Sequence, residues 1–328
     1  MPDRTTNVSR RDALILGGIA AGAALLPPFA GPAYAAAPKL GPVRPSLYRV
    51  GLGSFEVSTI LDGTVQLKGP HPIFGENQPA DVVQQFATQN LLPAERMETS
   101  FTPVVVNTGK EVILFDTGNG KGRRPGAGDL LDRLIASGIQ PSQVDIVVIT
   151  HFHGDHIGGL LRDGKPVFPN ARYFAGEAEY AAWTSPDMQT GPRAENAKFV
   201  KANVVPLRDK MTFLKPGQDV VTGVTAVDAF GHTPGMLAFR IESEGKPLLL
   251  MTDVTNHPVM SLARPDWYVR FDMDKEKAAS TRKRILDMVA SERMPVTGYH
   301  MPFPSIGYVD KAADGTYRWV QATYQLHL

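Results

Sequence analysis

The chain has 328 residues, of which 43% are hydrophobic and 20% are charged, with a formal net charge of +1. This composition is ordinary for a globular protein with a sizeable core, and it excludes disordered and fibrous classes. The chain contains no cysteine, which excludes disulfides, thiolate nucleophiles and cysteine-ligated zinc.

The first 35 residues are typical of an export signal. The pair Arg10-Arg11 precedes an apolar stretch, Ala13–Leu26, and Ala33-Tyr34-Ala35 forms an A-x-A cleavage site. The segment resembles a twin-arginine signal, so we expect residues 1–35 to be removed and the mature protein to be periplasmic or secreted. A membrane anchor is the alternative, but 14 apolar residues are few for a bilayer span, and we expect no stable membrane insertion after processing.

The mature chain, residues 36–328, is formally neutral. Removal of the signal takes away three arginines and two aspartates, which leaves 31 basic and 31 acidic residues. This balance gives no electrostatic reason to expect nucleic acid or an anionic membrane as a partner. No second domain and no short-period repeat is visible, so we predict a single domain.

The first half of the mature chain alternates strand and helix patterns. β-branched apolar runs predict strands, and helical periodicity between turn residues predicts helices. The predicted strands are Ser46–Val50, Phe55–Leu61, Thr64–Leu67, Val104–Val106, Val112–Phe115, Ile146–Ile149 and Tyr173-Phe174, and the predicted helices are Asp81–Asn90, Leu130–Ser137 with Asp129 as N-cap, and Glu177–Trp183.

Two segments of the first half read as loops near a site. Residues 118–126 are rich in glycine and proline, but they lack the Lys-Ser/Thr ending of a phosphate-binding loop and do not run straight into a helix. We therefore predict a mobile flap there. Residues 185–203 are polar and irregular, and we predict that they form a substrate lid.

The second half is also rich in strands. Strands are predicted at Val220–Asp228, Met236–Ile241, Pro247–Thr252 and Val296–Tyr299, followed by a hairpin across Asp314-Gly315. Lys275–Arg293 carries the strongest helix pattern, with Ala278, Ile285, Leu286 and Val289 on one apolar stripe. We expect Arg282, Lys283 and Arg284 to face water, as a solvated helix face and not as a nucleic-acid site.

Residues 150–156, Thr-His-Phe-His-Gly-Asp-His, concentrate metal-ligand side chains directly after a predicted strand. His151 and His153 project to the same side at strand spacing, and Gly154 permits a tight turn that can direct Asp155 and His156 toward a second ion. Imidazole and carboxylate favour Zn, Mn, Fe or Ni over Ca or Mg. Two such ions can share a hydroxide nucleophile at neutral pH.

This motif, His151-x-His153-x-Asp155-His156, resembles the signature of the metallo-β-lactamase superfamily of binuclear hydrolases. The remaining motif residues follow in the expected order, as Gly231–Gly235 with His232, then Asp253, then His300. The resemblance covers nearly all of the mature chain. It implies an α/β fold, a four-layer αββα sandwich made from two β-rich halves that each close with helices.

The resemblance also implies a ligand set and a mechanism. One ion takes His151, His153 and His232, the other takes Asp155, His156 and His300, and Asp253 bridges the two. The ions are two divalent metals, zinc foremost, with Mn, Fe, Co and Ni as alternatives. A bridging hydroxide attacks a carbonyl carbon or a phosphorus, and Asp155 or Asp253 passes a proton to the leaving group.

Asp116 stands behind the ligands in the superfamily, where a carboxylate holds a ligating imidazole. A turn-forming role in Asp-Thr-Gly is the alternative for this residue.

Several activities of the superfamily fit this sequence poorly. Asp253 and the absence of cysteine speak against a β-lactamase, and His153 with His156 speaks against the oxygen-reducing di-iron branch. Neutral charge speaks against RNA processing. A metal-binding scaffold without turnover is the alternative from another class, but structural zinc sites are normally closed and mononuclear.

Two small-molecule substrate classes remain, namely phosphotriesters with aryl esters, and lactones such as N-acyl-homoserine lactones. The sequence favours the phosphotriester branch, because lactonases of this type carry a tyrosine three residues after the bridging aspartate, where this chain has Asn256. A neutral triester needs an apolar wall and no cationic clamp. We predict a substrate pocket made of Trp183, Phe199, His257 and Phe271, and homodimer formation stays open.

Overall fold

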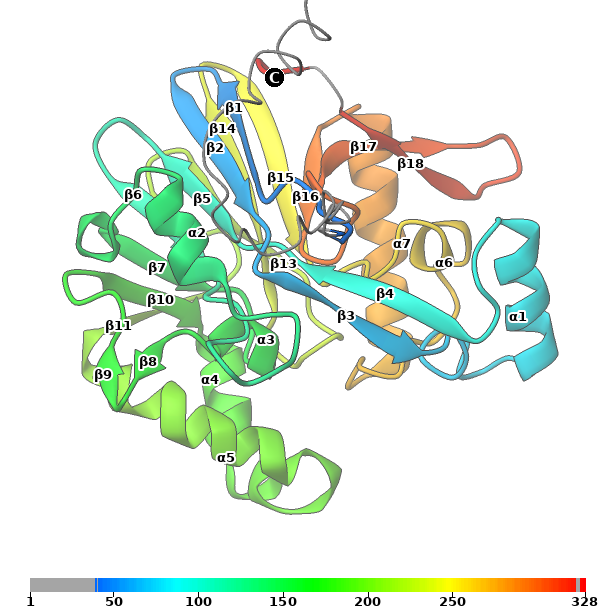
Figure 1. Ribbon diagram of the computed structural model, residues 1–328, viewed down its shortest axis with the longest axis horizontal. Coiled ribbons are helices and arrows are strands. Elements are labelled where there is room, and N and C mark those ends of the chain that lie inside the picture. Colours follow the sequence, from blue (N-terminus) through cyan, green and yellow to red (C-terminus); the bar gives the residue numbers. More distant parts are fainter. Residues whose placement is uncertain (1–38, 40, 323–324) are drawn as a thin grey trace, which may run out of the picture. The chain divides into compact units, whose positions relative to one another are not determined.

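The computed structural model describes residues 39, 41–322 and 325–328 (Figure 1). The predicted export signal and its cleavage site lie outside the described residues. Residues 44–328 form one unit, and every element named below belongs to it. No helix in the described part of the chain is long and apolar enough to cross a membrane.

Two seven-stranded sheets carry the fold. The first has the order β1-β2-β5-β6-β7-β10-β11 and the second the order β12-β13-β14-β15-β16-β17-β18. The first sheet comprises β1 (Leu47–Leu52), β2 (Phe55–Ile60), β5 (Val104–Asn107), β6 (Val112–Phe115), β7 (Ile146–Ile149), β10 (Arg172–Gly176) and β11 (Met211–Leu214). The second comprises β12 (Asp219–Val221), β13 (Val224–Asp228), β14 (Leu237–Ser243), β15 (Lys246–Thr252), β16 (Val296–Gly298), β17 (Ile306–Lys311) and β18 (Tyr317–Gln321).

Smaller elements complete the unit. The ribbons β3 (Gly63–Lys68) with β4 (Arg96–Phe101) and β8 (Leu161–Arg162) with β9 (Lys165–Pro166) are two-stranded. The α-helices are α1 (Ala80–Gln89), α2 (Leu130–Ala136), α3 (Gly154–Ile157), α4 (Glu177–Thr184), α5 (Ala194–Asn203), α6 (Met260–Ala263) and α7 (Lys275–Ser291). The short 3-10 helices are η1 (Pro141–Gln143), η2 (Pro186–Gln189), η3 (Gly191–Arg193) and η4 (Val205–Lys210).

The two sheets pack face to face, with helices on their outer faces (Figure 1). Side chains of β7 alternate, because successive residues of a strand point to opposite faces. Ile146 and Val148 join the core between the sheets, whereas Val147 and Ile149 pack beneath α2, α4 and α5. The aromatic rings of Phe115 and Phe239 meet across the two sheets at 5.2 Å. On the other side, α7 packs against the second sheet. This is the predicted αββα sandwich.

Parallel pairing places the ends of several strands at one edge. Strand β7 pairs in parallel with β6 and with β10, and β15 pairs in parallel with β16. Loops that follow the carboxyl ends of parallel strands gather at that edge, where α/β folds commonly build their sites. The predicted ligand motifs follow β7, β15 and β16.

The structure corrects three sequence predictions. Residues 194–203 of the predicted irregular lid form helix α5. Arg282 does not face water, since it is 1% exposed in the middle of α7. Asp129 makes no side-chain cap at α2, because the amide of Leu130 donates instead to Oδ1 of Asp62 at 2.9 Å.

Candidate metal centre

Seven residues from four segments converge at this edge of the sheets. His151 and His153 follow β7, Asp155 and His156 lie on α3, His232 follows β13, Asp253 follows β15 and His300 follows β16. Their ligand atoms form overlapping groups within 4.8 Å, namely His151-His153-His232, His151-His156-Asp253 and Asp155-His156-His300. The structure thus brings together every residue of the predicted ligand set.

The first triad consists of three imidazoles. Nδ1 of His153 lies 3.2 Å from Nε2 of His151 and 2.9 Å from Nε2 of His232. A neutral imidazole has one N–H donor and one acceptor, so three converging ring nitrogens cannot all be paired with one another. A cation that accepts lone pairs from all three satisfies them together.

The second triad consists of Asp155, His156 and His300, and Asp253 lies between it and the first triad. Oδ1 of Asp253 lies 3.4 Å from Nε2 of His156, and Oδ2 lies 3.1 Å from Nε2 of His300 and 3.3 Å from Nε2 of His232. Oδ2 of Asp155 lies 3.7 Å from Nε2 of His300. Asp253 is therefore the one carboxylate that reaches both triads.

Buried atoms without partners test whether these residues fit metal ions. Nε2 of His156 and Oδ1 of Asp253 are buried and make no hydrogen bond among the residues described. An unpaired buried polar atom costs about 1–3 kcal/mol, so a native structure rarely leaves several in one place. Both atoms point into the cluster, and the nitrogen and oxygen donor set suits zinc or a similar divalent ion. The residues fit two such ions.

Outer partners fix the orientation of three imidazoles. Nδ1 of His156 lies 2.8 Å from Oδ2 of Asp116, and Nδ1 of His232 lies 2.8 Å from Oδ1 of Asp272. Nδ1 of His300 faces the carbonyl of Ser100 at 2.8 Å. Each contact sets the ring tautomer and leaves Nε2 free for the cluster.

Asp116 also accepts bonds from the amide and the hydroxyl of Thr150, each at 2.9 Å, so the residue does more than form a turn.

Burial and charge shift the ionisation of the cluster. Burial lowers the pKa of His151 and of His153 well below 6.5, which favours the neutral form that binds metal. Burial opposes ionisation of Asp253, yet His300 and His156 together hold the pKa of that carboxyl well below its usual range. At neutral pH, therefore, His151 and His153 are neutral and Asp253 is a carboxylate.

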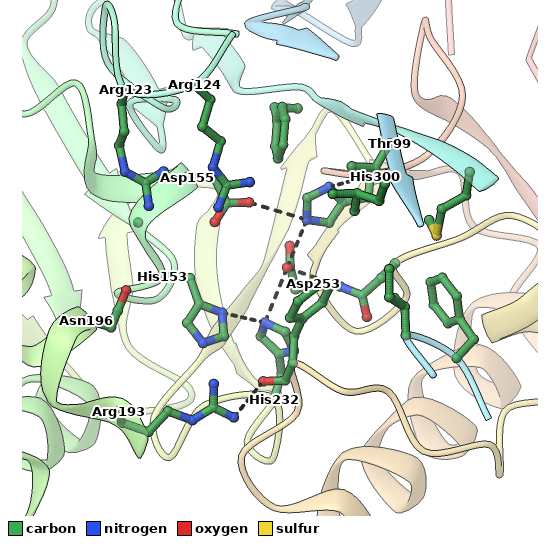
Figure 2. Close-up of a pocket in the computed structure, with 18 residues that line it drawn as sticks. Thr99, Arg123, Arg124, His153, Asp155, Arg193, Asn196, His232, Asp253 and His300 are labelled. Carbon is green, nitrogen blue, oxygen red and sulfur yellow. Dashed lines mark hydrogen bonds and ion pairs between the residues drawn. The ribbon is translucent and has the colours of Figure 1, made fainter. Parts of the chain in front are cut away.

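The cluster lies at the floor of a cavity of about 170 Å³ (Figure 2). Of the cluster, His153, Asp155, His232, Asp253 and His300 line it. Asn256 also faces the cavity and donates from Nδ2 to Oδ2 of Asp253 at 3.1 Å. Figure 2 shows Arg123 and Arg124 on one side of the cavity, with Arg193 and Asn196 on another. Sequence reasoning missed these polar residues.

Of the four residues predicted for the substrate pocket, only Phe271 lines this cavity, and it is 40% exposed. Trp183 is fully buried, and its Nε1 donates to Glu179 at 2.7 Å, which assigns it to the core. Phe199 packs against the same core and lies under the guanidinium of Arg123. His257 does not line this cavity. Its Nδ1 accepts from the amides of Val259 and Met260, and the residue lines a second cavity with Asn256 and His300.

Sequence comparison identifies the family. Residues 102–295, which contain six of the seven clustered residues, match the metallo-beta-lactamase superfamily. The chain belongs to this superfamily. The match confirms the resemblance seen in the ligand motifs, and His300 lies just beyond it.

Several curated relatives of this superfamily member are N-acyl homoserine lactonases, and ribonuclease Z of Pyrococcus furiosus matches over 63 residues at 33% identity, 19% of this chain and 18% of that enzyme. The chain is 32% identical over 130 residues to AttM of Agrobacterium fabrum (strain C58), which is 38% of this chain and 46% of AttM. It thus spans less than half of that relative. It is 26% identical over 223 residues to an N-acyl homoserine lactonase of a Bacillus species, which covers 62% of this chain and 82% of the relative.

Solved structures of the superfamily share the fold. The hydrolase AbOPH, of the beta lactamase superfamily, superposes with a TM-score of 0.79 at 26% identity over 86% of this chain and 99% of AbOPH. AidC, a dizinc quorum-quenching lactonase, superposes with a TM-score of 0.78 at 23% identity over 85% of this chain and 98% of AidC. At 23% identity, the similarity to AidC shows a shared fold and nothing further. The αββα architecture is therefore that of the metallo-beta-lactamase superfamily.

Proposed function

We propose that this protein is a binuclear metal-dependent hydrolase of small lactones or carboxylic esters. The observation that carries the proposal is the pair of ligand triads that share Asp253 at the floor of a cavity. The lactonase names of the curated relatives support the choice of substrate class.

The proposed ligand sets are His151, His153 and His232 for one ion and Asp155, His156 and His300 for the other, with Asp253 shared. When bound, two divalent ions would lower the pKa of water and stabilise the developing negative oxygen of an acyl substrate. The residues of the chain hold and orient this arrangement. Asn256 fixes Oδ2 of Asp253, and Asp116 and Asp272 fix His156 and His232.

In this proposal the carboxylate of Asp155 takes up the proton that the attacking water releases and then passes it to the leaving oxygen. Its side chain is 15% exposed and lines the cavity, whereas that of Asp253 is 3% exposed and is surrounded by imidazoles. Only a group that reaches the substrate can serve as a general acid. Asp155→Asn should therefore slow substrates with poor leaving groups, such as γ-butyrolactone, more than it slows phenyl acetate.

Hydrolysis of γ-butyrolactone and of phenyl acetate by zinc-loaded protein tests the proposal, with Lys283→Met as a control variant at an exposed surface position. Activity should disappear on removal of metal by a chelator and return with added zinc. Activity that persists in metal-free protein would contradict the proposal. Metal binding with no turnover of any ester or lactone, neutral or anionic, would support the non-catalytic scaffold instead.

The preference for phosphotriesters stays a prediction. Paraoxon, measured beside γ-butyrolactone, tests it directly. The position at which the lactonases' tyrosine would be expected holds Asn256. This residue lines the cavity and contacts Asp253, so it is placed to act on substrate.

A further inference from the structure

Three arginines line the cavity above the ligand cluster. Arg123 and Arg124 belong to the loop between β6 and α2, and Arg193 ends the 3-10 helix η3. Figure 2 shows these guanidinium groups reaching toward the cavity from two sides. Sequence analysis predicted a flap at residues 118–126 and a lid at residues 185–203, and the three arginines belong to these two segments.

Within the described part of the chain, none of the three arginines has a carboxylate within ion-pair distance of 4.0 Å. Arg123 donates to Oδ1 of Asn119 at 3.1 Å, and Arg193 donates to the carbonyl of Phe271 at 3.4 Å. Arg124 lies over the ring of Phe101 at 5.7 Å. Guanidinium groups that line a cavity are suited to bind an anion, because their N–H donors match the oxygens of a carboxylate or phosphate. Among the described residues, no acidic side chain takes that place for Arg123, Arg124 or Arg193.

The position of Arg123 is built into the site. An added Cβ at Gly154 would lie 2.1 Å from Nη2 of Arg123, so the guanidinium rests directly on the backbone between His153 and Asp155. The Phe199 ring lies beneath it at 4.9 Å. Its hydrogen-bond partner Asn119 is in turn held by the buried carboxylate of Asp62. The group is thus pre-organised for a ligand at the cavity rim.

The aspartates of the ligand cluster are not free to pair with these arginines. Asp155 and Asp253 are the aspartates that line the cavity, and both belong to the proposed ligand set. Two divalent ions carry more positive charge than these two carboxylates neutralise.

We propose that the substrate of this hydrolase carries an oxyanion group, a carboxylate or a phosphate, which Arg123, Arg124 and Arg193 bind while its ester or lactone group meets the ligand cluster. The proposal rests on the hydrolase function proposed above and narrows its substrate class. It opposes the expectation of a neutral substrate that needs no cationic clamp. The small cavity, about 170 Å³, favours a compact ligand.

Three acetyl esters test the proposal: 4-acetoxybenzoate, 4-acetoxyphenyl phosphate and neutral 4-acetoxybenzamide. The benzoate and the benzamide have nearly the same shape, so their ratio of kcat/KM isolates the charge. In zinc-loaded wild-type protein, one of the anionic esters should be preferred over the amide at least tenfold, and added salt should reduce that preference. The better anionic ester identifies the group as carboxylate or phosphate.

Arg123→Gln and Arg193→Gln should each lower kcat/KM for the preferred anionic ester by about tenfold, mainly through KM, since each removes one charge-assisted hydrogen bond. The amide should change less than threefold, and zinc content should stay the same. Arg208→Gln is the matched control, because Arg208 is exposed and lies outside the cavity. Arg208→Gln should leave kcat/KM unchanged for the anionic ester and for the amide.

Equal kcat/KM for the amide and both anionic esters would overturn the proposal while leaving the hydrolase function standing. If no ester is turned over, equilibrium binding of 4-hydroxybenzoate, 4-hydroxyphenyl phosphate and 4-hydroxybenzamide to zinc-loaded protein decides. Anion binding that Arg123→Gln weakens would support the clamp and contradict the hydrolase function. Anion binding unaffected by Arg123→Gln and Arg193→Gln, or none at all, would overturn the clamp.

Discussion

Replacement of Arg282 by methionine should destabilise the protein strongly. Arg282 is 1% exposed, and its guanidinium donates to the carbonyls of Val254, Pro265 and Trp267 and to Oδ2 of Asp272 at 2.8 Å. Methionine keeps the apolar stem but leaves a buried carboxylate and three carbonyl acceptors without this donor. Loss of one partner of a buried ion pair costs about 3–5 kcal/mol.

Urea unfolding of metal-free protein measures this cost. With a slope of about 3 kcal/mol per molar urea, the expected loss lowers the unfolding midpoint by ~1–1.7 M. Arg282→Lys keeps the charge but cannot reproduce the fork of donors, so its midpoint should lie between those of wild type and methionine variant. Lys283→Met, on the exposed face of the same helix, is the control and should change the free energy of unfolding by less than about 0.5 kcal/mol.

Arg282 should also matter for metal binding, because Asp272 accepts from Arg282 with one oxygen and contacts Nδ1 of His232 with the other. Loss of such an outer partner typically weakens metal affinity by about 10–100-fold. Zinc affinity of Arg282→Met, measured under conditions where the variant is folded, should fall within that range. A midpoint shift below about 0.3 M urea together with unchanged zinc affinity would refute the reasoning.

Four further predictions follow from the same structure. Elemental analysis of metal-replete protein should find two ions per chain, and one or none would contradict the shared role of Asp253. Asp253→Asn should lose more activity than Asp116→Asn, because Asp253 reaches both triads whereas Asp116 orients His156, and equal losses would reject that ranking. Burial lowers the pKa of His257 from 6.5 to about 4, so the unfolded chain binds a proton at this residue more tightly than the folded protein. The free energy of unfolding should therefore fall by about 3 kcal/mol as the pH drops from 6.5 through 4. The urea midpoint of His257→Asn should therefore fall less with decreasing pH than that of the wild type. An equal fall in both proteins would contradict this role of His257. Arg10→Lys combined with Arg11→Lys should keep the precursor in the cytoplasm, and fractionation that finds full-length protein in the membrane would support an anchor instead.

The ligand set was predicted from the resemblance of its motifs to those of the metallo-β-lactamase superfamily, and the structure brings the seven residues together. The motif 150–156 is contiguous, and it follows an unbroken β-branched run that forms β7. The remaining clustered residues also follow strands, so the edge-of-sheet rule brings them together without knowledge of the loops. Helix α7 was placed within two residues for a similar reason, since its periodicity is long and regular.

The burial of Arg282 could have been read from spacing alone. It lies four residues after Ala278, three before Ile285 and seven before Val289, which places it on the apolar stripe of α7. Its membership in a run of three basic residues suggested a solvated face instead. A charged residue at a stripe position predicts a buried partner, and here that partner is Asp272.

The pocket residues could not be predicted, because they depend on long-range contacts. The loop that carries Arg123 takes its shape from Asp62, whose carboxylate accepts from the amides of Asn119, Gly128 and Leu130, 57 to 68 residues away. An aspartate before a glycine in the sequence simply indicates a turn. Likewise, Trp183 reads as a possible pocket wall until its bond to Glu179 shows that it faces inward.

Glu179 shows how the fold holds the first ligand triad in place. It is fully buried on α4, and it accepts from the amide of Phe152 at 2.8 Å, the hydroxyl of Thr233 at 2.7 Å and the amide of Gly235 at 2.9 Å. Phe152 lies between two ligand histidines, and Thr233 follows His232 directly. One carboxylate therefore ties together the two loops that supply this triad.

The burial of the Glu179 carboxyl is unfavourable by itself, but this carboxyl connects the two loops that supply the first triad. Burial raises the pKa of this carboxyl despite all its hydrogen bonds, so burial at this position opposes the charged form. A well-packed apolar residue in its place would join no loops. Because Asp116 and Asp272 hold His156 and His232 in the same manner, the ligand atoms are fixed by the protein's own hydrogen bonds. The centre is thus pre-organised for its ions, and disruption of these carboxylates should weaken metal binding before it alters the sheets.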